Sequence, residues 1–186
     1  MKKTPTAFDR DWDGDRSRVV NTPHKDCAWV FAGEGVATRK LDGTSCMIRD
    51  GKLYRRRELR KGDAAPPSFE VADVDDETGK TVGWVPVDSD PTNRWHLEAF
   101  DTNRVYVNGT YELVGPKIQG NPERYAEHEL VNHEAPDLIL DPQPPRDFEG
   151  LRAWMTDQDI EGVVWHHSDG RMAKLKLRDF GLKRKR

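Results

Sequence analysis

Three short turns constrain the fold of this sequence, because each lies between two runs of strand-forming residues. The turns are Asp50-Gly51, Asn108-Gly109 and Ser168-Asp169-Gly170, and the runs that they join are 44–48 with 52–57, 105–107 with 110–114, and 161–165 with 172–177. Asp-Gly and Asn-Gly pairs favour the left-handed backbone of tight hairpin turns. Such short turns join antiparallel strands, whereas parallel strands need long crossovers. The sequence therefore predicts an α+β fold of antiparallel sheets with a few short helices.

Other segments complete this outline. We expect strands over residues 28–31 and 36–40, which are apolar runs separated by glycines. Asn121 followed by Pro122 predicts the start of a helix, and Asp147 is expected to cap a second short helix.

The length and composition indicate one folded domain. The chain has 186 residues, and its six Trp, six Phe and four Tyr suffice for a core, which argues against disorder. Residues 1–26 are polar and show little periodicity, so we expect a loop-rich lead-in before a single domain over residues 27–186.

The charge of the chain is unevenly distributed. The formal net charge is −3, yet residues 171–186 and the run Arg55-Arg56-Arg57 are strongly basic. Basic patches on a weakly acidic protein can bind a polyanion such as RNA. An alternative for residues 183–186 is a solvated tail or a targeting sequence.

Metal-ligand and membrane patterns are missing from the sequence. Cys27 and Cys46 form no Cys-x-x-Cys pair, and the six histidines are scattered, so a structural zinc site is not expected. We find no apolar run of the length of a signal peptide or a membrane span, and therefore expect a soluble protein of the cytoplasm.

Lys40 begins the tetrapeptide Lys-Leu-Asp-Gly at the end of a predicted strand. A free lysine has a pKa of about 10.4, so it is almost always charged at neutral pH. Burial or neighbouring cations would lower that pKa and create a nucleophile. Arg39 precedes Lys40, and Lys174 and Lys176 are further cations if the last hairpin packs opposite. These residues predict a lysine that attacks the α-phosphate of a nucleotide and expels pyrophosphate.

Strand alternation predicts which side chains of the last hairpin face this site. Lys174 and Lys176 are two residues apart and share a face, while Leu175 points into the core. On the other strand we expect Glu161 to project into the site, with Val164 packed behind it. A carboxylate near two lysines and a triphosphate can hold Mg²⁺ directly or through water.

Glu112, in the run 110–114, is a further acidic candidate, because its carboxylate can accept hydrogen bonds from a ribose hydroxyl. Each feature taken alone has a simpler interpretation. A Lys-x-Lys pair on a strand, an isolated glutamate and an arginine run are ordinarily polar surface. The order in which they occur is what favours a function.

In order along the chain, KLDG, YELVG, EGVVW and AKLKLRDFG resemble the motifs of the covalent nucleotidyltransferase superfamily, which includes ATP-dependent polynucleotide ligases and capping enzymes. The resemblance is greatest to RNA ligases, in particular to a small family of 5′-to-3′ RNA ligases. It extends over residues 28–182.

The resemblance implies a nucleotidyltransferase domain of ATP-grasp-like fold that uses ATP and Mg²⁺, with Mn²⁺ as an alternative ion. Lysyl-AMP would form first, AMP would pass to a 5′-phosphate RNA end, and a 3′-hydroxyl end would complete the joint. The implied residues are the nucleophile Lys40, the nucleotide-binding residues Arg39, Arg56, Arg57, Glu112, Lys174 and Lys176, and the metal-binding residue Glu161. Motif similarity favours Arg56 among Arg55 to Arg57.

The sequence ends ten residues after Lys176, so we expect no OB-fold domain of the kind that DNA ligases and capping enzymes carry. Two alternatives to an ATP-dependent RNA ligase stay open. One is a related nucleotidyltransferase that uses GTP or acts on DNA, and the other is an inactive RNA-binding module. The oligomeric state and the residue that stacks on adenine are not predicted.

Overall fold

Two of the three predicted hairpins form in the structure, which is a computed structural model that describes residues 3–75 and 79–184. Asp50 and Gly51 have φ values of 52° and 71° and join β4 (Thr44–Arg49) to β5 (Lys52–Leu59). The turn that ends at Gly170, with φ of 91°, joins β10 (Gly162–His166) to β11 (Met172–Lys176). The strand pairs found in the described residues are antiparallel, and the predicted α+β class is confirmed.

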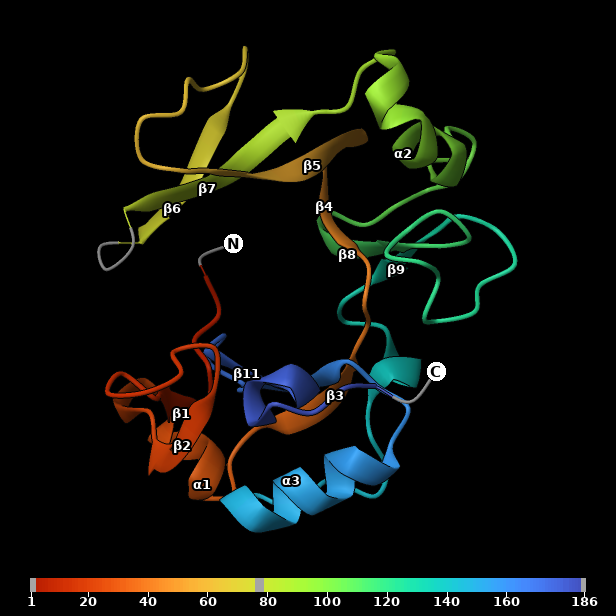
Figure 1. Ribbon diagram of the computed structural model, residues 1–186. Coiled ribbons are helices and arrows are strands. Elements are labelled where there is room, and N and C mark those ends of the chain that lie inside the picture. Colours follow the sequence, from red (N-terminus) through yellow and green to blue (C-terminus); the bar gives the residue numbers. More distant parts are fainter. Residues whose placement is uncertain (1–2, 76–78, 185–186) are drawn as a thin grey trace. The chain divides into compact units, whose positions relative to one another are not determined.

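The chain divides into two units by its internal contacts (Figure 1). The middle unit comprises residues 1–3 and 42–134, and the flanking unit comprises residues 4–41 and 135–186. The predicted lead-in over residues 1–26 and the single domain over residues 27–186 stay predictions, although the lead-in does contain two short strands.

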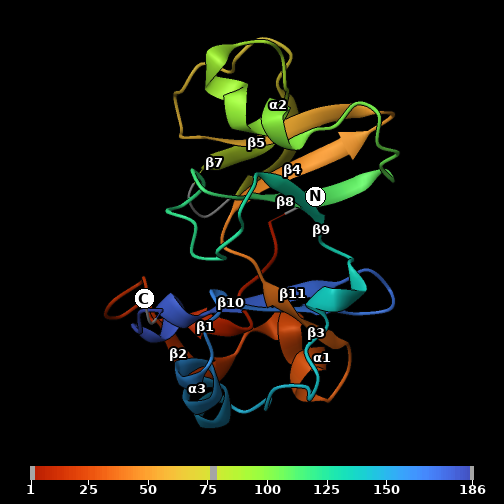
Figure 2. The same cartoon turned by 90° about the vertical axis from the view of Figure 1, so that its right-hand side faces the viewer.

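The middle unit is built on a six-stranded sheet of order β6-β7-β5-β4-β8-β9 (Figure 2). Its further elements are β6 (Glu70–Asp75), β7 (Lys80–Pro86), η2 (Pro91–Asn93), α2 (Arg94–Ala99), β8 (Gly109–Val114) and β9 (Glu129–Asn132). One face of this sheet buries Cys46, Ile48, Tyr111 and Leu113 against α2 and the segment that follows it. Because side chains alternate along a strand, the intervening residues lie on the opposite face, which carries the polar side chains of interest.

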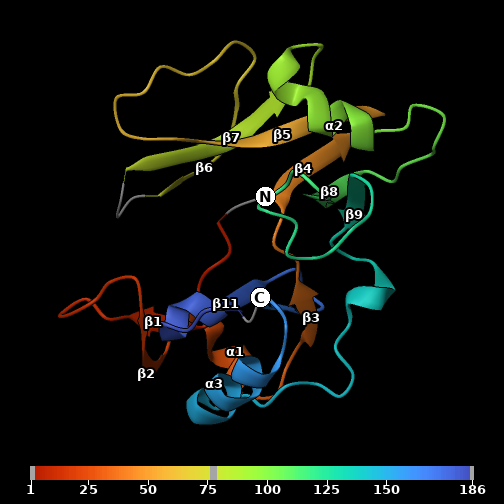
Figure 3. The same ribbon diagram turned by 45° about the vertical axis from the view of Figure 1, so that its right-hand side comes forward.

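The flanking unit combines a three-stranded sheet of order β11-β10-β3 with a two-stranded sheet and two helices (Figure 3). Its further elements are β1 (Phe8–Arg10), β2 (Val19–Pro23), η1 (Lys25–Cys27), α1 (Ala28–Phe31), β3 (Val36–Lys40), η3 (Pro136–Leu138), α3 (Phe148–Asp157) and η4 (Leu177–Phe180). The predicted cap of α3 is confirmed, since Asp147 Oδ1 accepts a hydrogen bond from the Gly150 amide at 2.8 Å.

The core of the flanking unit lies between its larger sheet and its helices. Val163, Trp165 and Leu175 are fully buried on one sheet face, and Leu151 and Met155 of α3 are fully buried in the same cluster. The other face of the sheet is therefore left for partly exposed polar side chains.

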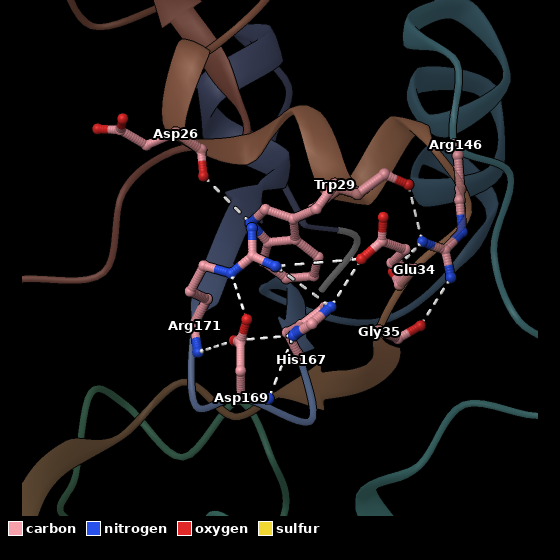
Figure 4. A network of polar contacts seen from close by, with 9 residues as sticks. Asp26, Trp29, Glu34, Gly35, Arg146, His167, Asp169 and Arg171 are labelled. Carbon is pink, nitrogen blue, oxygen red and sulfur yellow. Dashed lines mark hydrogen bonds and ion pairs between the residues drawn. The ribbon is translucent and has the colours of Figure 1, made fainter.

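A polar network fastens α1 to the far end of the last hairpin (Figure 4). The two ring nitrogens of His167 lie 2.7 Å from Glu34 Oε2 and 2.8 Å from Asp169 Oδ1. Arg171 lies over the ring of Trp29, and Arg146 donates to three backbone carbonyls at the end of α1. This network binds the loop after α1 to the turn between β10 and β11. None of the predicted site residues takes part in it.

Three local predictions are wrong. Residues 28–31 form α1 rather than a strand, because a helical turn buries Trp29 and Val30 in the core of the flanking unit. Residues 105–107 form no strand, since Val105 and Val107 are 94% and 64% exposed and β8 pairs with β4 and β9 instead. Asn121 begins no helix: its φ is 55°, and its side chain bonds the backbone of Tyr125 across a turn.

Among the described residues, no helix is both long and apolar enough to cross a membrane.

The larger sheet of the flanking unit offers a matched test of its packing. We expect Val163→Ala to lower the free energy of unfolding by about 1.5–3 kcal/mol, because it removes two buried methyl groups. Val36→Ala, on the neighbouring strand and 46% exposed, should change it by less than about 0.5 kcal/mol. Urea unfolding followed by tryptophan fluorescence measures both, and equal losses would contradict the assigned core face.

Candidate active site

One carboxylate joins two of the predicted lysines in the flanking unit. Glu161 Oε2 lies 2.6 Å from Lys40 Nζ, and Glu161 Oε1 lies 2.6 Å from Lys176 Nζ. The three side chains are only 13–20% exposed. Hydrogen bonds between charged groups are stronger than those between neutral groups. Because these side chains are largely shielded from solvent, dissolved salt screens their attraction less than it would at an exposed site.

The register of the sheet explains why these side chains meet. Gly162 of β10 pairs with Lys40 of β3 on one side and with Lys176 of β11 on the other. Gly162 therefore lies between two lysines in neighbouring strands. A Cβ at this position would clash with the carbonyl oxygen of Leu175 and lie 2.9 Å from the Cα of Lys176. The glycine of the EGVVW motif thus permits the close pairing that brings the lysines together.

Strand parity was predicted wrongly for β10. Val163 and Trp165 are fully buried in the core, so Val164 and Gly162 share the open face with Lys174 and Lys176. Glu161 nevertheless reaches the two lysines, because it lies in a bend before the strand begins and is not bound by strand alternation.

The ion pairs control the titration of Glu161. Burial by itself raises the pKa of this carboxyl, but the charges of Lys40 and Lys176 and their hydrogen bonds outweigh burial and hold the pKa below the ordinary glutamate value of 4.5. The carboxylate is therefore ionised at neutral pH.

The other two predicted residues of this unit have different surroundings. Lys174 lies two residues before Lys176 on the same open face, opposite Val164. Arg39 points to the other side of β3 from Lys40, and its guanidinium donates to the carbonyl oxygen of Asp159 at 3.2 Å. Arg39 is thus adjacent to Lys40 in sequence but separated from it by strand alternation.

In the middle unit, Glu112 is the central polar residue of the open sheet face. It is only 6% exposed, and its Oε2 lies 2.9 Å from His133 Nε2. The other ring nitrogen of His133 lies 2.9 Å from Thr110 Oγ1. Ser45 pairs with Glu112 across the neighbouring strand β4 and therefore shares its face.

The three consecutive arginines of β5 are separated by the same alternation. Arg55 pairs with Cys46, whose side chain is in the core, so Arg55 and Arg57 face the side of α2. Arg56 faces the side of Glu112 and lies within range of its charge. Burial lowers the pKa of Arg56, and the charges of Glu58, Asp73 and Glu112 act against that shift. The preference for Arg56 over its neighbours agrees with this geometry.

Gly43, the last residue of the KLDG motif, packs beneath Glu112. A Cβ on Gly43 would clash with the carbonyl oxygen of Leu113 and lie 2.8 Å from the Cγ of Glu112. The division between the two units falls inside this motif, between Leu41 and Asp42. The motif thus supplies a lysine to one unit and a close-packed glycine to the other.

The predicted residues therefore form two separate groups. The flanking unit holds Arg39, Lys40, Glu161, Lys174 and Lys176, and the middle unit holds Arg56, Arg57 and Glu112. His133 was not predicted, since the six histidines are scattered along the sequence, and neither was Ser45. Neither residue lies in one of the motifs, and only the pairing of β8 with β4 and β9 brings them beside Glu112.

A metal ion at this site would have one protein ligand, a single carboxylate. Within the described ranges, no group of three or more His, Cys, Asp or Glu side chains is arranged to hold a metal ion. Mg²⁺ characteristically takes one or two carboxylates together with substrate phosphates and water. Glu161 could serve as that single carboxylate if a nucleotide supplied the other ligands.

The packing of Gly43 can be tested with a matched glycine. Gly43→Ala should lower the free energy of unfolding by about 1–3 kcal/mol, because its methyl group overlaps the backbone of Leu113. Gly109→Ala, at the start of β8 and with open space around it, should leave stability unchanged within about 0.5 kcal/mol. Chemical denaturation of both variants decides the matter, and a tolerated Gly43→Ala would refute the close approach.

The ion pairs of Glu161 predict a pH-dependent contribution to stability. Because the pKa of Glu161 is lowered on folding, its stabilising effect is present above the unfolded value of 4.5 and is lost as the pH falls through the lower folded value. Glu161→Gln should cost about 1–3 kcal/mol at neutral pH. Unfolding measured from pH 7 to pH 3 should show the difference between wild type and variant shrinking in acid. A difference that is constant with pH would contradict the ion pairs.

Comparison with known proteins agrees with the motifs. A model of the RNA ligase 1 family matches residues 104–185, which is 82 of the 186 residues. RNA ligase 1 of Danio rerio is 29% identical over 145 residues, covering 59% of this chain and 43% of that protein. RNA ligase 1 of Pongo abelii is 28% identical over 142 residues, with the same coverage. For RNA ligase 1 of Rattus norvegicus the identity is 27% over 159 residues, covering 68% of this chain and 46% of that protein.

The matches thus span less than half the length of these relatives. The family-model match includes Glu112, Glu161, Lys174 and Lys176. The resemblance to RNA ligases is confirmed, since the chain is similar to RNA ligase 1 proteins over these segments.

Proposed function

We propose that this protein is an ATP-dependent RNA ligase that joins 5′-phosphate and 3′-hydroxyl RNA ends through a lysyl-AMP intermediate. The observation that carries the proposal is the group Lys40–Glu161–Lys176, in which a lysine at the end of a strand lies beside a second lysine and a carboxylate. The relationship to RNA ligase 1 proteins supports RNA as the substrate. We further propose that the fold is that of a nucleotidyltransferase domain.

The first step would form a phosphoramidate on Lys40. Its ammonium group gives up a proton to water, and the neutral amine attacks the α-phosphorus of ATP. The new P–N bond forms as the bond from that phosphorus to the bridging oxygen breaks, and pyrophosphate leaves. Negative charge grows on the phosphate oxygens, and fixed cations in a water-poor site stabilise it.

Glu161 has two parts in this proposal. Before the nucleotide binds, it holds Lys40 and Lys176 in place at 2.6 Å each. Phosphate groups compete with the carboxylate for Lys176 and Lys174, which would then neutralise the α-phosphate and the departing pyrophosphate. Glu161 would also be the protein ligand of Mg²⁺ or Mn²⁺, and that ion neutralises charge on the phosphates when bound.

Residues of the middle unit are assigned to the rest of the nucleotide. Glu112 would accept a hydrogen bond from a ribose hydroxyl, and Arg56 would bind the ribose or a phosphate. Both lie on the open face of the six-stranded sheet, away from its core. We do not assign Arg57 or Arg39 a direct contact, because each points to the opposite face of its strand.

The later steps would transfer AMP and seal the RNA. An oxygen of the RNA 5′-phosphate attacks the phosphorus of lysyl-AMP, the P–N bond breaks, and the lysine is regenerated. The 3′-hydroxyl of the other end then attacks the 5′-phosphate, loses its proton and expels AMP. Positioning and charge neutralisation suffice for such phosphoryl chemistry.

The proposal predicts a covalent adduct on one lysine. Incubation with ATP labelled at the α-phosphate and Mg²⁺ should leave label on the protein after a denaturing gel. Lys40→Ala should abolish it, and Lys176→Ala should slow labelling by about 100-fold, as removal of a charge-stabilising donor does in other enzymes. Lys25→Ala, an exposed lysine of the same unit, is the control and should label normally.

The same assay separates the alternatives. Label from GTP but not ATP, or sealing of nicked DNA but not RNA, would replace the proposal by a related nucleotidyltransferase. An unlabelled protein that still binds RNA would leave an inactive RNA-binding module. Equal labelling of wild type and Lys40→Ala would refute Lys40 as the nucleophile.

A further inference from the structure

We propose that His133 is a positioning residue, which orients the carboxylate of Glu112 toward a ribose hydroxyl and so makes the protein select ribonucleotides over deoxyribonucleotides. This inference rests on the proposed function, since it assumes that a nucleotide binds beside Glu112.

The backbone holds His133 next to Glu112. His133 directly follows β9, and its amide donates to the carbonyl oxygen of Thr110 at 3.1 Å, which continues the pairing of β9 with β8. The ring therefore lies along β8 over Thr110 and Glu112, two residues apart on one face. The His133 side chain is 23% exposed and that of Glu112 is 8% exposed, so both are shielded from water.

A single neutral form of the imidazole satisfies both neighbours. Nε2–H donates to Glu112 Oε2, and Nδ1 accepts from the hydroxyl of Thr110, each over 2.9 Å. A carboxylate can only accept, whereas a hydroxyl can donate or accept, so this is the arrangement in which the ring and Thr110 complement each other. A Thr110 hydroxyl that donates to Nδ1 would favour the tautomer whose Nε2–H donates to Glu112, since the bond made by one ring nitrogen sets the role of the other.

The arrangement leaves the other oxygen of Glu112 available to a ligand. Of its two oxygens, only Oε2 has a hydrogen-bond partner among the residues that the structure describes. Across β4, the buried hydroxyl of Ser45 likewise has no partner within the described part of the chain. A carboxylate oxygen and a hydroxyl in neighbouring strands suit a small group that donates hydrogen bonds. The hydroxyls of a ribose have this property, and a deoxyribose has one fewer.

The fixed orientation is what would give selectivity. A carboxylate that is free to rotate can turn either oxygen to a ligand or to water. Its hydrogen bonds are then replaced by water when a ligand hydroxyl is absent, so little binding free energy is lost. A carboxylate held on one oxygen and largely buried keeps an unpaired acceptor when a deoxynucleotide binds, and that acceptor carries a cost.

Two substitutions of His133 separate positioning from general structure. A glutamine amide can place its nitrogen near the position of imidazole Nε2, whereas the shorter asparagine amide reaches only the position of Nδ1. His133→Gln should therefore keep the contact with Glu112, and His133→Asn should lose it. The readout is the KM for lysyl-AMP formation with ATP and with 2′-deoxy-ATP and 3′-deoxy-ATP.

For wild type and His133→Gln we expect either 2′-deoxy-ATP or 3′-deoxy-ATP to have a KM about tenfold above that of ATP. This factor corresponds to the loss of one hydrogen bond between the nucleotide and Glu112. In His133→Asn this ratio should fall toward one while the maximal rate stays near that of wild type. Glu129→Ala, an exposed residue at the other end of β9, is the control and should keep the ratio. A ratio unchanged in His133→Asn, or lost equally in His133→Gln, would overturn the inference.

A double substitution tests whether His133 acts through Glu112. Glu112→Ala alone should abolish the ratio, and adding His133→Asn should change it no further. A further change in the double variant would contradict a role through Glu112. Failure of the proposed function is distinguishable, because a wild-type protein that forms no adduct with ATP refutes that function, whereas normal labelling with an unchanged ratio refutes only the role of His133.

Discussion

The carboxylate of Glu161 is the interaction on which the candidate chemistry depends. The ammonium groups of Lys40 and Lys176, on the two strands that flank β10, would repel each other, and one carboxylate with an oxygen for each offsets that repulsion. The arrangement needs Gly162 between the lysines, because any side chain there would press on β11. A single acidic residue and a single glycine, adjacent in sequence, thus make it feasible to keep two cations within reach of one phosphate.

Strand alternation sorts the remaining polar residues. In each unit one sheet face is covered by helices and apolar side chains, and the other keeps polar side chains. Lys40 is separated from Arg39, and Arg56 from Arg55 and Arg57, by this rule alone. A run of like charges in the sequence is therefore a poor guide to local charge density, because neighbours in a strand act on different faces.

Sequence analysis succeeded where local chemistry decides the structure. Asp50-Gly51 and Asp147 behave as expected, because turns and caps depend on a few adjacent residues. It failed where distant contacts decide, as at residues 28–31, which are apolar enough for a strand but are buried as a helix. Lys40, Glu161 and Lys176 lie together in the structure, although the parity argument for Glu161 was wrong. His133 could not be found, since only strand pairing brings it to Glu112.

The division of the chain has a consequence for the order of folding. Apart from residues 1–3, the middle unit comes from one continuous segment, residues 42–134, whereas the flanking unit combines residues 4–41 with 135–186. During synthesis all strands of the six-stranded sheet leave the ribosome before β10 and β11 exist, so β3 must wait for its partners. Lys40 meets Glu161 only after some 120 further residues have been made. The candidate active-site group of Lys40, Glu161 and Lys176 is therefore among the last parts of the chain to be assembled.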